Sequence, residues 1–193
     1  MIISHRGNNN HHFKENSLLA IKDVLSKNYI DGAEFDIRIT KDKKFILNHS
    51  FINNGKIIKY TNSKYLNSDN LKDVLKNIKS NKLLLIEIKD NDYRIIDLLY
   101  KILKKFKHLN IYFMTFYKDL AIKLKSKYPI LKVGLISFTL KEVPTLDFIC
   151  LYYLNYEKTE KELFVWTVNN KDKIKRFNSM NINIITDKPY LLK

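Results

Sequence analysis

Short hydrophobic runs alternate with amphipathic stretches along most of the chain. Eight runs have the length and apolar content of buried strands, at residues 2–5, 33–37, 83–88, 111–116, 131–136, 147–152, 164–168 and 182–186. Five intervening segments carry apolar residues at helical spacing, at residues 17–27, 71–79, 93–106, 118–127 and 171–180. Strands that alternate with helices pair in parallel, and eight of them predict a closed (β/α)₈ TIM barrel of the α/β class.

The predicted barrel is compact. The chain has 193 residues, which suits a single domain over residues 1–193, whereas a complete barrel takes about 250 residues. The segments near Leu140 and Glu160 are too short for full helices, and little chain follows the eighth strand. We therefore expect thin helical cover around the fifth, sixth and eighth strands. An open doubly wound sheet is the rival architecture, but no glycine-rich phosphate loop follows any strand.

One stretch after the second strand departs from the alternation. Residues 40–43 form a polar turn, and the strand-like run 45–49 follows it. This pattern predicts a hairpin within a small insertion, residues 40–68, between the second strand and the second helix. A turn centred near Asp42 would place residue 49 opposite residue 34, and so bring His49 close to Glu34.

Composition bears on the class of partner. The formal net charge is +15, but the positive residues are mostly Lys and are spread along a chain also rich in Asn and Ile, which indicates a coding bias. A nucleic-acid site would more often cluster Lys and Arg among stacking aromatics, so no nucleic-acid partner is expected. A basic surface favours anionic small substrates and leaves peripheral contact with a lipid surface open. No apolar run approaches the ~20 residues of a membrane span, and the amino-terminal residues suggest the first strand of a cytoplasmic protein.

Carboxylates lie at the ends of two predicted strands. Glu34 and Asp36 share one face of the second strand, and Glu87 lies near the end of the third. Function in a barrel sits at the carboxyl ends of the strands. Three converging carboxylates suit one hard divalent cation, Mg²⁺ or Ca²⁺, whereas zinc would recruit His or Cys. The alternative is internal ion pairs, Glu87 with Lys89 and either carboxylate of the second strand with Arg38.

Two histidines and an arginine accompany these carboxylates. His5 and Arg6 end the first strand, and His49 lies in the predicted hairpin. A histidine titrates near neutral pH, so His5 and His49 are candidates for an acid and a base. Arg6 is a candidate for bidentate binding of a phosphoryl group.

These residues, in this order, resemble the glycerophosphodiester phosphodiesterase family. The matching pieces are His5-Arg6-Gly7, Glu15-Asn16-Ser17, Gly32-Ala33-Glu34-Phe35-Asp36-Ile37, Thr40-Lys41-Asp42, Asn48-His49, Glu87-Ile88-Lys89, Trp166-Thr167-Val168-Asn169 and Thr186-Asp187-Lys188-Pro189. The spaced set spans nearly the whole chain and is far more specific than any single motif.

The resemblance implies a TIM-barrel enzyme that hydrolyses glycerophosphodiesters, which are its small-molecule substrates, to glycerol 3-phosphate and an alcohol. It implies the following roles: metal ligands Glu34, Asp36 and Glu87; an acid/base pair, His5 and His49; phosphate contacts from Arg6 and Lys89; Glu15 near the metal and the glycerol hydroxyls; and Trp166 lining the pocket. The family's usual Asp after the second histidine is Ser50 here.

Two alternatives use the same barrel. One is phospholipase D-like or lyase action on lysophospholipids, and the other is a catalytically silent barrel that binds phosphodiesters or membranes. The intact histidines and carboxylates argue against the silent barrel.

Overall fold

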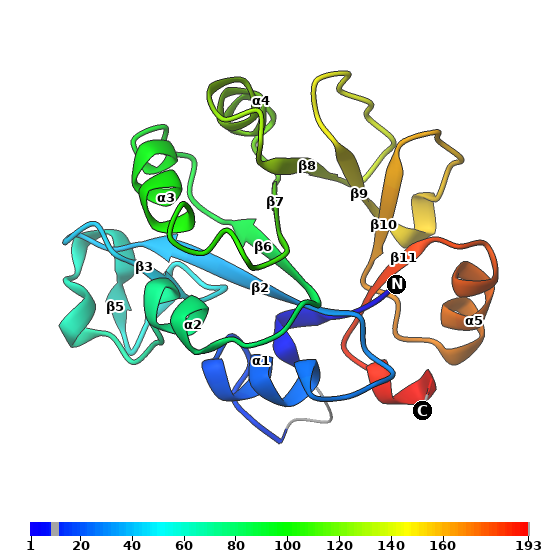
Figure 1. Cartoon of the computed structure of the whole chain (residues 1–193), viewed down its shortest axis with the longest axis horizontal. Coiled ribbons are helices and arrows are strands. Elements are labelled where there is room, and N and C mark those ends of the chain that lie inside the picture. Colours follow the sequence, from blue (N-terminus) through cyan, green and yellow to red (C-terminus); the bar gives the residue numbers. More distant parts are fainter. Residues whose placement is uncertain (9–11, 193) are drawn as a thin grey trace.

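The computed structural model describes residues 1–8 and 12–192, and parallel strands close into a barrel at its centre (Figure 1). The eight barrel strands of this described part are β1 (Ile2–Ser4), β2 (Gly32–Ile39), β6 (Leu83–Ile88), β7 (Ile111–Thr115), β8 (Lys132–Ser137), β9 (Phe148–Tyr152), β10 (Glu162–Trp166) and β11 (Asn183–Thr186). Each strand pairs with the next in the chain, and β1 pairs in parallel with both β2 and β11, which closes the ring. The predicted TIM barrel is confirmed.

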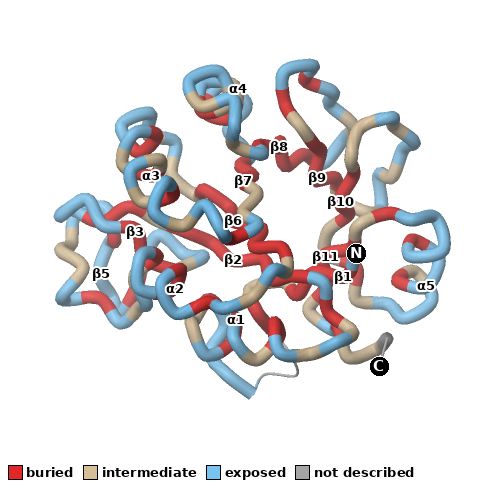
Figure 2. The backbone as a smooth tube through the Cα atoms, viewed as in Figure 1, coloured by how far each residue is buried: buried red, intermediate tan, exposed pale blue. Residues whose placement is uncertain are grey.

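Helices surround part of the barrel (Figure 1). They are α1 (Leu18–Leu25), α2 (Leu71–Asn77), α3 (Ile95–Leu103), α4 (Lys118–Lys127) and α5 (Lys171–Ser179). Each helix buries one face; in α3 this face includes Ile95, Ile96 and Leu99. Figure 2 shows the exposed faces turned outward. Most of the helical stability therefore comes from packing of the apolar stripe on the strands.

The helical cover is thin where the short connections predict it. Within residues 132–166, the chain passes from β8 to β9 and from β9 to β10 without an α-helix, and only the short 3₁₀ turn η4 (Tyr153–Asn155) intervenes. After β11 comes another 3₁₀ segment, η5 (Pro189–Leu192).

Two phenylalanine rings pack among aliphatic side chains in the barrel interior. The rings of Phe148 and Phe164 meet edge to face at 5.2 Å. Gly134 of β8 makes room for them, because a Cβ at this position would lie 2.3 Å from the Phe148 ring. Such close packing is what a small barrel needs to fill its centre without voids.

The insertion between β2 and α2 holds β3 (Phe45–Leu47), β4 (Ile52–Asn53), β5 (Lys56–Ile57), η2 (Ile58–Tyr60) and η3 (Ser63–Tyr65). Strand β3 pairs antiparallel with β2, as predicted, but the register differs by one residue, since Leu47 faces Ile37. The expected register would have placed Leu47 opposite Asp36. The turn explains the difference: Thr40 N donates to Lys44 O at 2.9 Å, which encloses three residues, and Lys43 takes a left-handed conformation with φ 58°.

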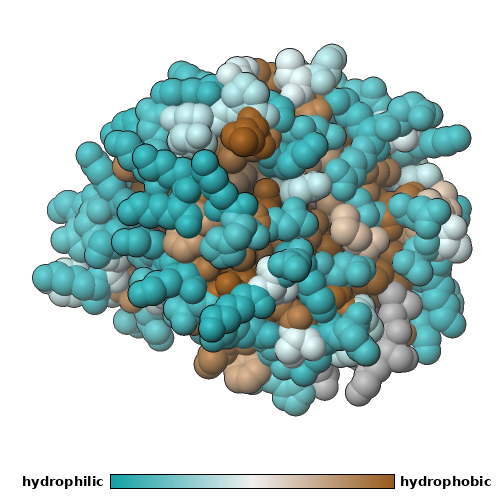
Figure 3. Space-filling model, viewed as in Figure 1, coloured by the Kyte–Doolittle hydropathy of each residue, from teal (hydrophilic) through white to brown (hydrophobic). Residues whose placement is uncertain are grey.

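Hydrophilic residues cover most of the face in Figure 3, and hydrophobic atoms show between them in smaller areas. None of the helices in the described residues is long and apolar enough to cross a membrane.

Candidate active site

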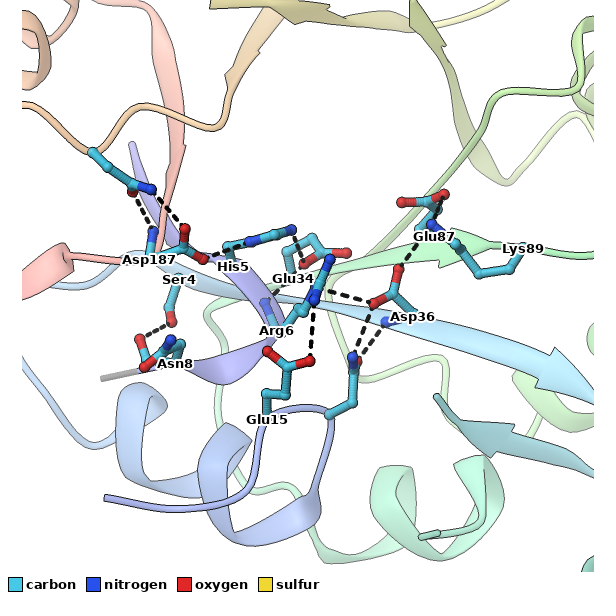
Figure 4. A network of polar contacts seen from close by, with 12 residues as sticks. Ser4, His5, Arg6, Asn8, Glu15, Glu34, Asp36, Glu87, Lys89 and Asp187 are labelled. Carbon is cyan, nitrogen blue, oxygen red and sulfur yellow. Dashed lines mark hydrogen bonds and ion pairs between the residues drawn. The ribbon is translucent and has the colours of Figure 1, made fainter. Parts of the chain in front are cut away.

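Polar side chains from the carboxyl ends of β1, β2, β6 and β11 converge at one end of the barrel (Figure 4). The chain leaves β1 through the 3₁₀ turn η1 (His5–Gly7), where Arg6 and Gly7 have φ of 55° and 67°. A Cβ on Gly7 would lie 3.1 Å from the backbone of Ala20, so this glycine allows the turn to pack against α1. The turn directs the backbone N–H of Arg6 to Oε2 of Glu34 at 2.8 Å.

Three buried carboxylates form the centre of the site. Glu34 and Asp36 come from one face of β2, and Glu87 faces Asp36 across the β2–β6 pair. Each residue offers an oxygen, and these atoms all lie within 4.8 Å of one another. Asn16 holds Asp36 by two bonds: its Nδ2 donates to Oδ2 at 2.9 Å, and its Oδ1 accepts from the Asp36 N–H at 2.8 Å.

Burial of like charges alters the titration of this group. Desolvation raises the pKa of Glu34 to about 8, and the charge of Asp36 adds to the effect. The same two causes raise the pKa of Glu87 to about 7. The site therefore favours bound protons or another cation among its carboxylates.

Ion pairs satisfy the carboxylates only in part. Lys89 Nζ lies 2.7 Å from Glu87 Oε1 and 3.5 Å from Asp36 Oδ1, which matches one predicted ion pair. The other predicted pair is wrong, because Arg38 contacts Asp90 at 2.9 Å instead of a carboxylate of the site. Within the described residues, Oε1 of Glu34 is buried without a hydrogen-bond partner. A buried unpaired carboxylate oxygen beside two more carboxylates fits a divalent cation with oxygen ligands.

His5 is fixed by a chain of hydrogen bonds. Its Nδ1 donates to Asp187 Oδ1 at 2.6 Å, and Asp187 accepts from Asn169 Nδ2 at 2.6 Å. The ring thus presents Nε2 toward Glu34, 3.9 Å from Oε2. Desolvation lowers the pKa of His5, but the bond to Asp187 and the charge of Glu34 outweigh it, so the net shift of this pKa is upward.

His49 has a different environment. It follows β3, its side chain is exposed, and its carbonyl accepts from Arg38 Nε at 3.0 Å. Desolvation at the cavity wall lowers the pKa of His49, against the opposing charge of Asp36. Ser50, the position that departs from the family pattern, accepts the N–H of Ile52 at 3.1 Å through Oγ.

A cavity of about 280 Å³ joins these groups to an apolar wall. Phe116, Phe138 and Trp166 line this wall, with ring centroids 5.4–5.8 Å apart. Trp166 Nε1 donates to the carbonyl of Cys150 at 3.0 Å, which fixes the indole. One side of the cavity is thus charged and the other is aromatic.

The structure places most predicted site residues around this cavity. Seven line it: His5, Arg6, Glu34, His49, Glu87, Lys89 and Trp166. Asp36 lies behind them, with Oδ2 3.6 Å from Arg6 Nε. Glu15 is not among the lining residues; it is connected to the cavity through Arg6, whose Nη1 donates to Glu15 Oε1 at 3.0 Å.

Several residues of the site were not assigned a role from the sequence. Asn16, Asn169 and Asp187 each belong to a motif that matches the family, so the motifs mark these residues. The motifs do not indicate which side chains they contact. Phe116 and Phe138 directly follow β7 and β8, and position after a barrel strand is the signal that would have found them.

Comparison with known proteins agrees with this geometry. The model of the Glycerophosphoryl diester phosphodiesterase family matches residues 5–55, which include His5, Glu34, Asp36 and His49. No curated protein matches the chain.

Solved structures resemble the whole chain. A glycerophosphodiester phosphodiesterase from Parabacteroides distasonis has a TM-score of 0.85 at 19% identity, over 99% of this chain and 94% of its own. The glycerophosphodiester phosphodiesterase from Thermotoga maritima has a TM-score of 0.78 at 21% identity, over 98% and 95%. An Oleispira antarctica phosphodiesterase in complex with the product sn-glycerol-3-phosphate has a TM-score of 0.85 at 14% identity, over 100% and 94%. At these identities the structures establish the fold.

The resemblance predicted from the motifs is thus confirmed: residues 5–55 match the model of the Glycerophosphoryl diester phosphodiesterase family, and the whole chain has the barrel fold of solved glycerophosphodiester phosphodiesterases.

Proposed function

We propose that this chain hydrolyses glycerophosphodiesters to glycerol 3-phosphate and an alcohol, with one divalent cation, Mg²⁺ or Ca²⁺. The observation that carries the proposal is the carboxylate trio, whose oxygens lie within 4.8 Å of one another; two of its members, Glu34 and Glu87, line a cavity together with two histidines. The sn-glycerol-3-phosphate in the Oleispira antarctica phosphodiesterase supports the substrate class.

The donor set fits the cation. Glu34, Asp36 and Glu87 are its proposed ligands, and the unpaired Oε1 of Glu34 is an available ligand atom. When bound, a divalent cation polarises a phosphoryl oxygen as a Lewis acid.

The basic side chains are proposed to bind phosphate. Arg6 and Lys89 line the cavity beside the carboxylates, and they offset the negative charge that develops on the phosphoryl oxygens during the reaction. Glu15 accepts a hydrogen bond from Arg6 Nη1; we assign it to orienting Arg6 and binding glycerol hydroxyls. Trp166 forms the apolar side of the pocket.

His5 and His49 are the proposed acid/base pair. Because Asp187 accepts from Nδ1 of His5, Nε2 is the nitrogen that transfers a proton. One histidine accepts the proton of the nucleophile, and the other protonates the departing alcohol oxygen. Both a water molecule and the neighbouring glycerol hydroxyl are nucleophiles that this arrangement accommodates.

The decisive test measures glycerol 3-phosphate released from glycerophosphocholine with Mg²⁺, Ca²⁺ or a chelator. We expect the chelator to abolish release and His49→Ala to lower its rate by roughly 10²–10⁴-fold, the usual contribution of a positioned acid or base. His108→Ala is the matched control, because His108 is an exposed histidine outside the candidate site; it should leave the rate of release unchanged. Undiminished turnover after chelation contradicts the metal role.

Lysophospholipids are a second candidate substrate class, with phospholipase D-like or lyase chemistry at the same residues. The aromatic wall favours it, since Phe138 is 57% exposed beside the cavity. Comparing a water-soluble diester with a lysolipid separates the two. Binding of a diester without turnover would instead indicate the silent barrel. The cytoplasmic location and the absence of a nucleic-acid partner stay predictions.

A further inference from the structure

Residues 48–67, between β3 and α2, present hydrophobic side chains to solvent. The exposed members are Phe51, Ile52, Ile57, Tyr60 and Tyr65. Exposed hydrophobic residues that occur singly need no explanation, whereas a group within one short segment indicates an interaction surface. We call residues 48–67 the insertion segment.

The insertion segment is anchored from below. Ile58 and Leu66 are buried together with Ile46, and Figure 2 shows buried stretches of tube alternating with exposed ones around β5. Asn53 Nδ2 donates to Asn48 Oδ1 at 2.9 Å, which ties the hairpin to its base. The exposed residues are therefore held outward by a packed framework.

The β4–β5 hairpin shows this most clearly. Its turn contains Asn54 and Gly55, both with positive φ, the usual chemistry of a tight hairpin. Ile52 and Ile57 face each other across the two strands, and both are exposed, at 42% and 46%. This exposed apolar pair is therefore available to contact a partner.

The charge of the insertion segment has one sign. It contains Lys56, Lys59 and Lys64 and no Asp or Glu. Lys56 and Lys64 lie over the ring of Tyr65, with Nζ at 5.4 Å and 4.9 Å from its centroid. These two lysines and the ring of Tyr65 thus lie together on the outer surface.

We propose that the insertion segment docks this chain on the surface of an anionic phospholipid membrane. Apolar side chains flanked by lysines are the combination that binds a bilayer interface, where the apolar groups enter the acyl boundary and the lysines attract anionic head groups. A two-fold contact with a second copy would instead bring the lysines of both copies together, where they repel.

Docking at this position relates directly to the candidate site. His49 lies at the start of the insertion segment and lines the cavity, so a membrane bound here is close to the cavity entrance. If the chain has the proposed function, docking here should favour diesters that carry a lipid chain. That consequence rests on the proposed function, whereas docking itself does not.

The first experiment sediments the full chain with vesicles of phosphatidylcholine, with and without phosphatidylglycerol. We expect binding to the anionic vesicles to be roughly tenfold or more tighter, because each lysine near an anionic surface adds to the attraction. Raising the salt concentration should weaken it. Failure of the chain to sediment with anionic vesicles overturns the proposal.

Two double variants locate the contact. Phe51→Ser with Ile57→Thr should weaken binding to anionic vesicles at every salt concentration, and Lys56→Gln with Lys64→Gln should weaken it mainly at low salt. Ile130→Ser with Met180→Ser is the control, because both residues are exposed in loops that precede barrel strands. Equal loss in the control, or no loss in either test variant, contradicts docking through the insertion segment.

Four further measurements distinguish the possible outcomes. Circular dichroism and thermal melting establish that the variants fold, and if the apolar variant does not, the lysine variant decides the question. Sedimentation equilibrium that shows a dimer dispersed by Phe51→Ser, without vesicle binding, assigns the surface to a second copy and overturns the proposal. Hydrolysis of glycerophosphocholine is assayed separately, so an inactive chain that still binds vesicles removes the proposed function and leaves docking supported.

Discussion

The two sides of the cavity are built by different means. At the ends of β1, β2, β6 and β11, hydrogen bonds and ion pairs position charged groups: Asp187 holds His5, Asn16 holds Asp36, and Lys89 pairs with Glu87. At the ends of β7 to β10, ring packing holds aromatic side chains, as between Phe138 and Trp166 at 5.4 Å. The same end of the barrel thus combines two sides. The polar side holds its groups in fixed directions, and the apolar side restricts only the shape of what can bind.

This difference separates two tasks. Charges fixed in a buried site stabilise developing charge without reorganising, so small changes there alter the chemical step. Rings exclude water and contact the apolar parts of a substrate, so changes there alter which substrates bind. The polar side should therefore govern kcat and the aromatic side KM.

Glu34→Gln is the most severe test of the polar side. Gln keeps the size of the side chain and an acceptor for the N–H of Arg6 but removes the charge. We expect glycerol 3-phosphate production to fall roughly 10³-fold, the scale of losing a major electrostatic contribution. Steady-state kinetics at saturating cation measure the loss, and calorimetry should show weaker cation binding.

The matched control is Glu162→Gln. Glu162 is partly buried at the start of β10, at the opposite end of that strand from Trp166, and its charge is far from the trio in the barrel. It should leave both kinetics and cation affinity nearly unchanged. Activity of Glu34→Gln within tenfold of the unaltered chain would exclude Glu34 as a required ligand.

Asp187→Asn tests positioning on the polar side. The amide oxygen still accepts a bond from His5 Nδ1, but the charge that raises the pKa of His5 is lost. We expect kcat to fall roughly 10–10²-fold, as for other residues that orient a functional group. The limb of the pH–rate profile that reports His5 should move to lower pH. A purely structural role would lower the melting temperature and leave that limb in place.

Phe138→Ala tests the aromatic side. It removes a ring that contacts Phe116 and Trp166 but no charged group. KM should rise by up to about tenfold, the scale of losing apolar contacts in a pocket, with kcat little changed. Leu154→Ala, exposed in the next loop, is the control. A fall in kcat as large as that for Glu34→Gln would refute the division of tasks.

The fold was largely predictable because apolar runs mark buried strands. The predicted strand 83–88 coincides with β6 (Leu83–Ile88), whereas the prediction 164–168 is displaced from β10 (Glu162–Trp166). Glu162 belongs to the strand because it pairs with Phe148. Val168 leaves the strand but stays buried, since it packs in the cluster that includes Ile174 of α5. Hydropathy alone does not distinguish an apolar residue that is buried within a strand from one that is buried in a loop packed against a helix.

The sequence predicts which residues belong to the candidate site, but it does not predict which of them contact one another. Motifs identified the carboxylates and histidines, but the partner of His5 comes from closure of the barrel, which brings Asp187 beside it across nearly the whole chain. Pairing of β1 with β11 creates that contact. The hairpin register was missed for a local reason, because one extra turn residue shifts every later pair.

The pH dependence of stability in the metal-free protein gives the smallest expected effect and tests the polar side alone. Burial raises the pKa of Glu34 to about 8 and that of Glu87 to about 7. Between the ordinary carboxyl pKa and these values, the folded state binds more protons than the unfolded state, so stability falls as pH rises. In chelator, the melting temperature should be higher near pH 6 than near pH 8.5, and a divalent cation should restore more stability at the higher pH.

Two variants test whether the carboxylates cause this trend. Glu34→Gln should flatten the dependence of the melting temperature on pH, because its amide has no proton to lose, whereas Phe138→Ala should leave the slope intact. A melting temperature in chelator that rises with pH over this interval would show that the carboxylates remain charged in the folded protein without a cation.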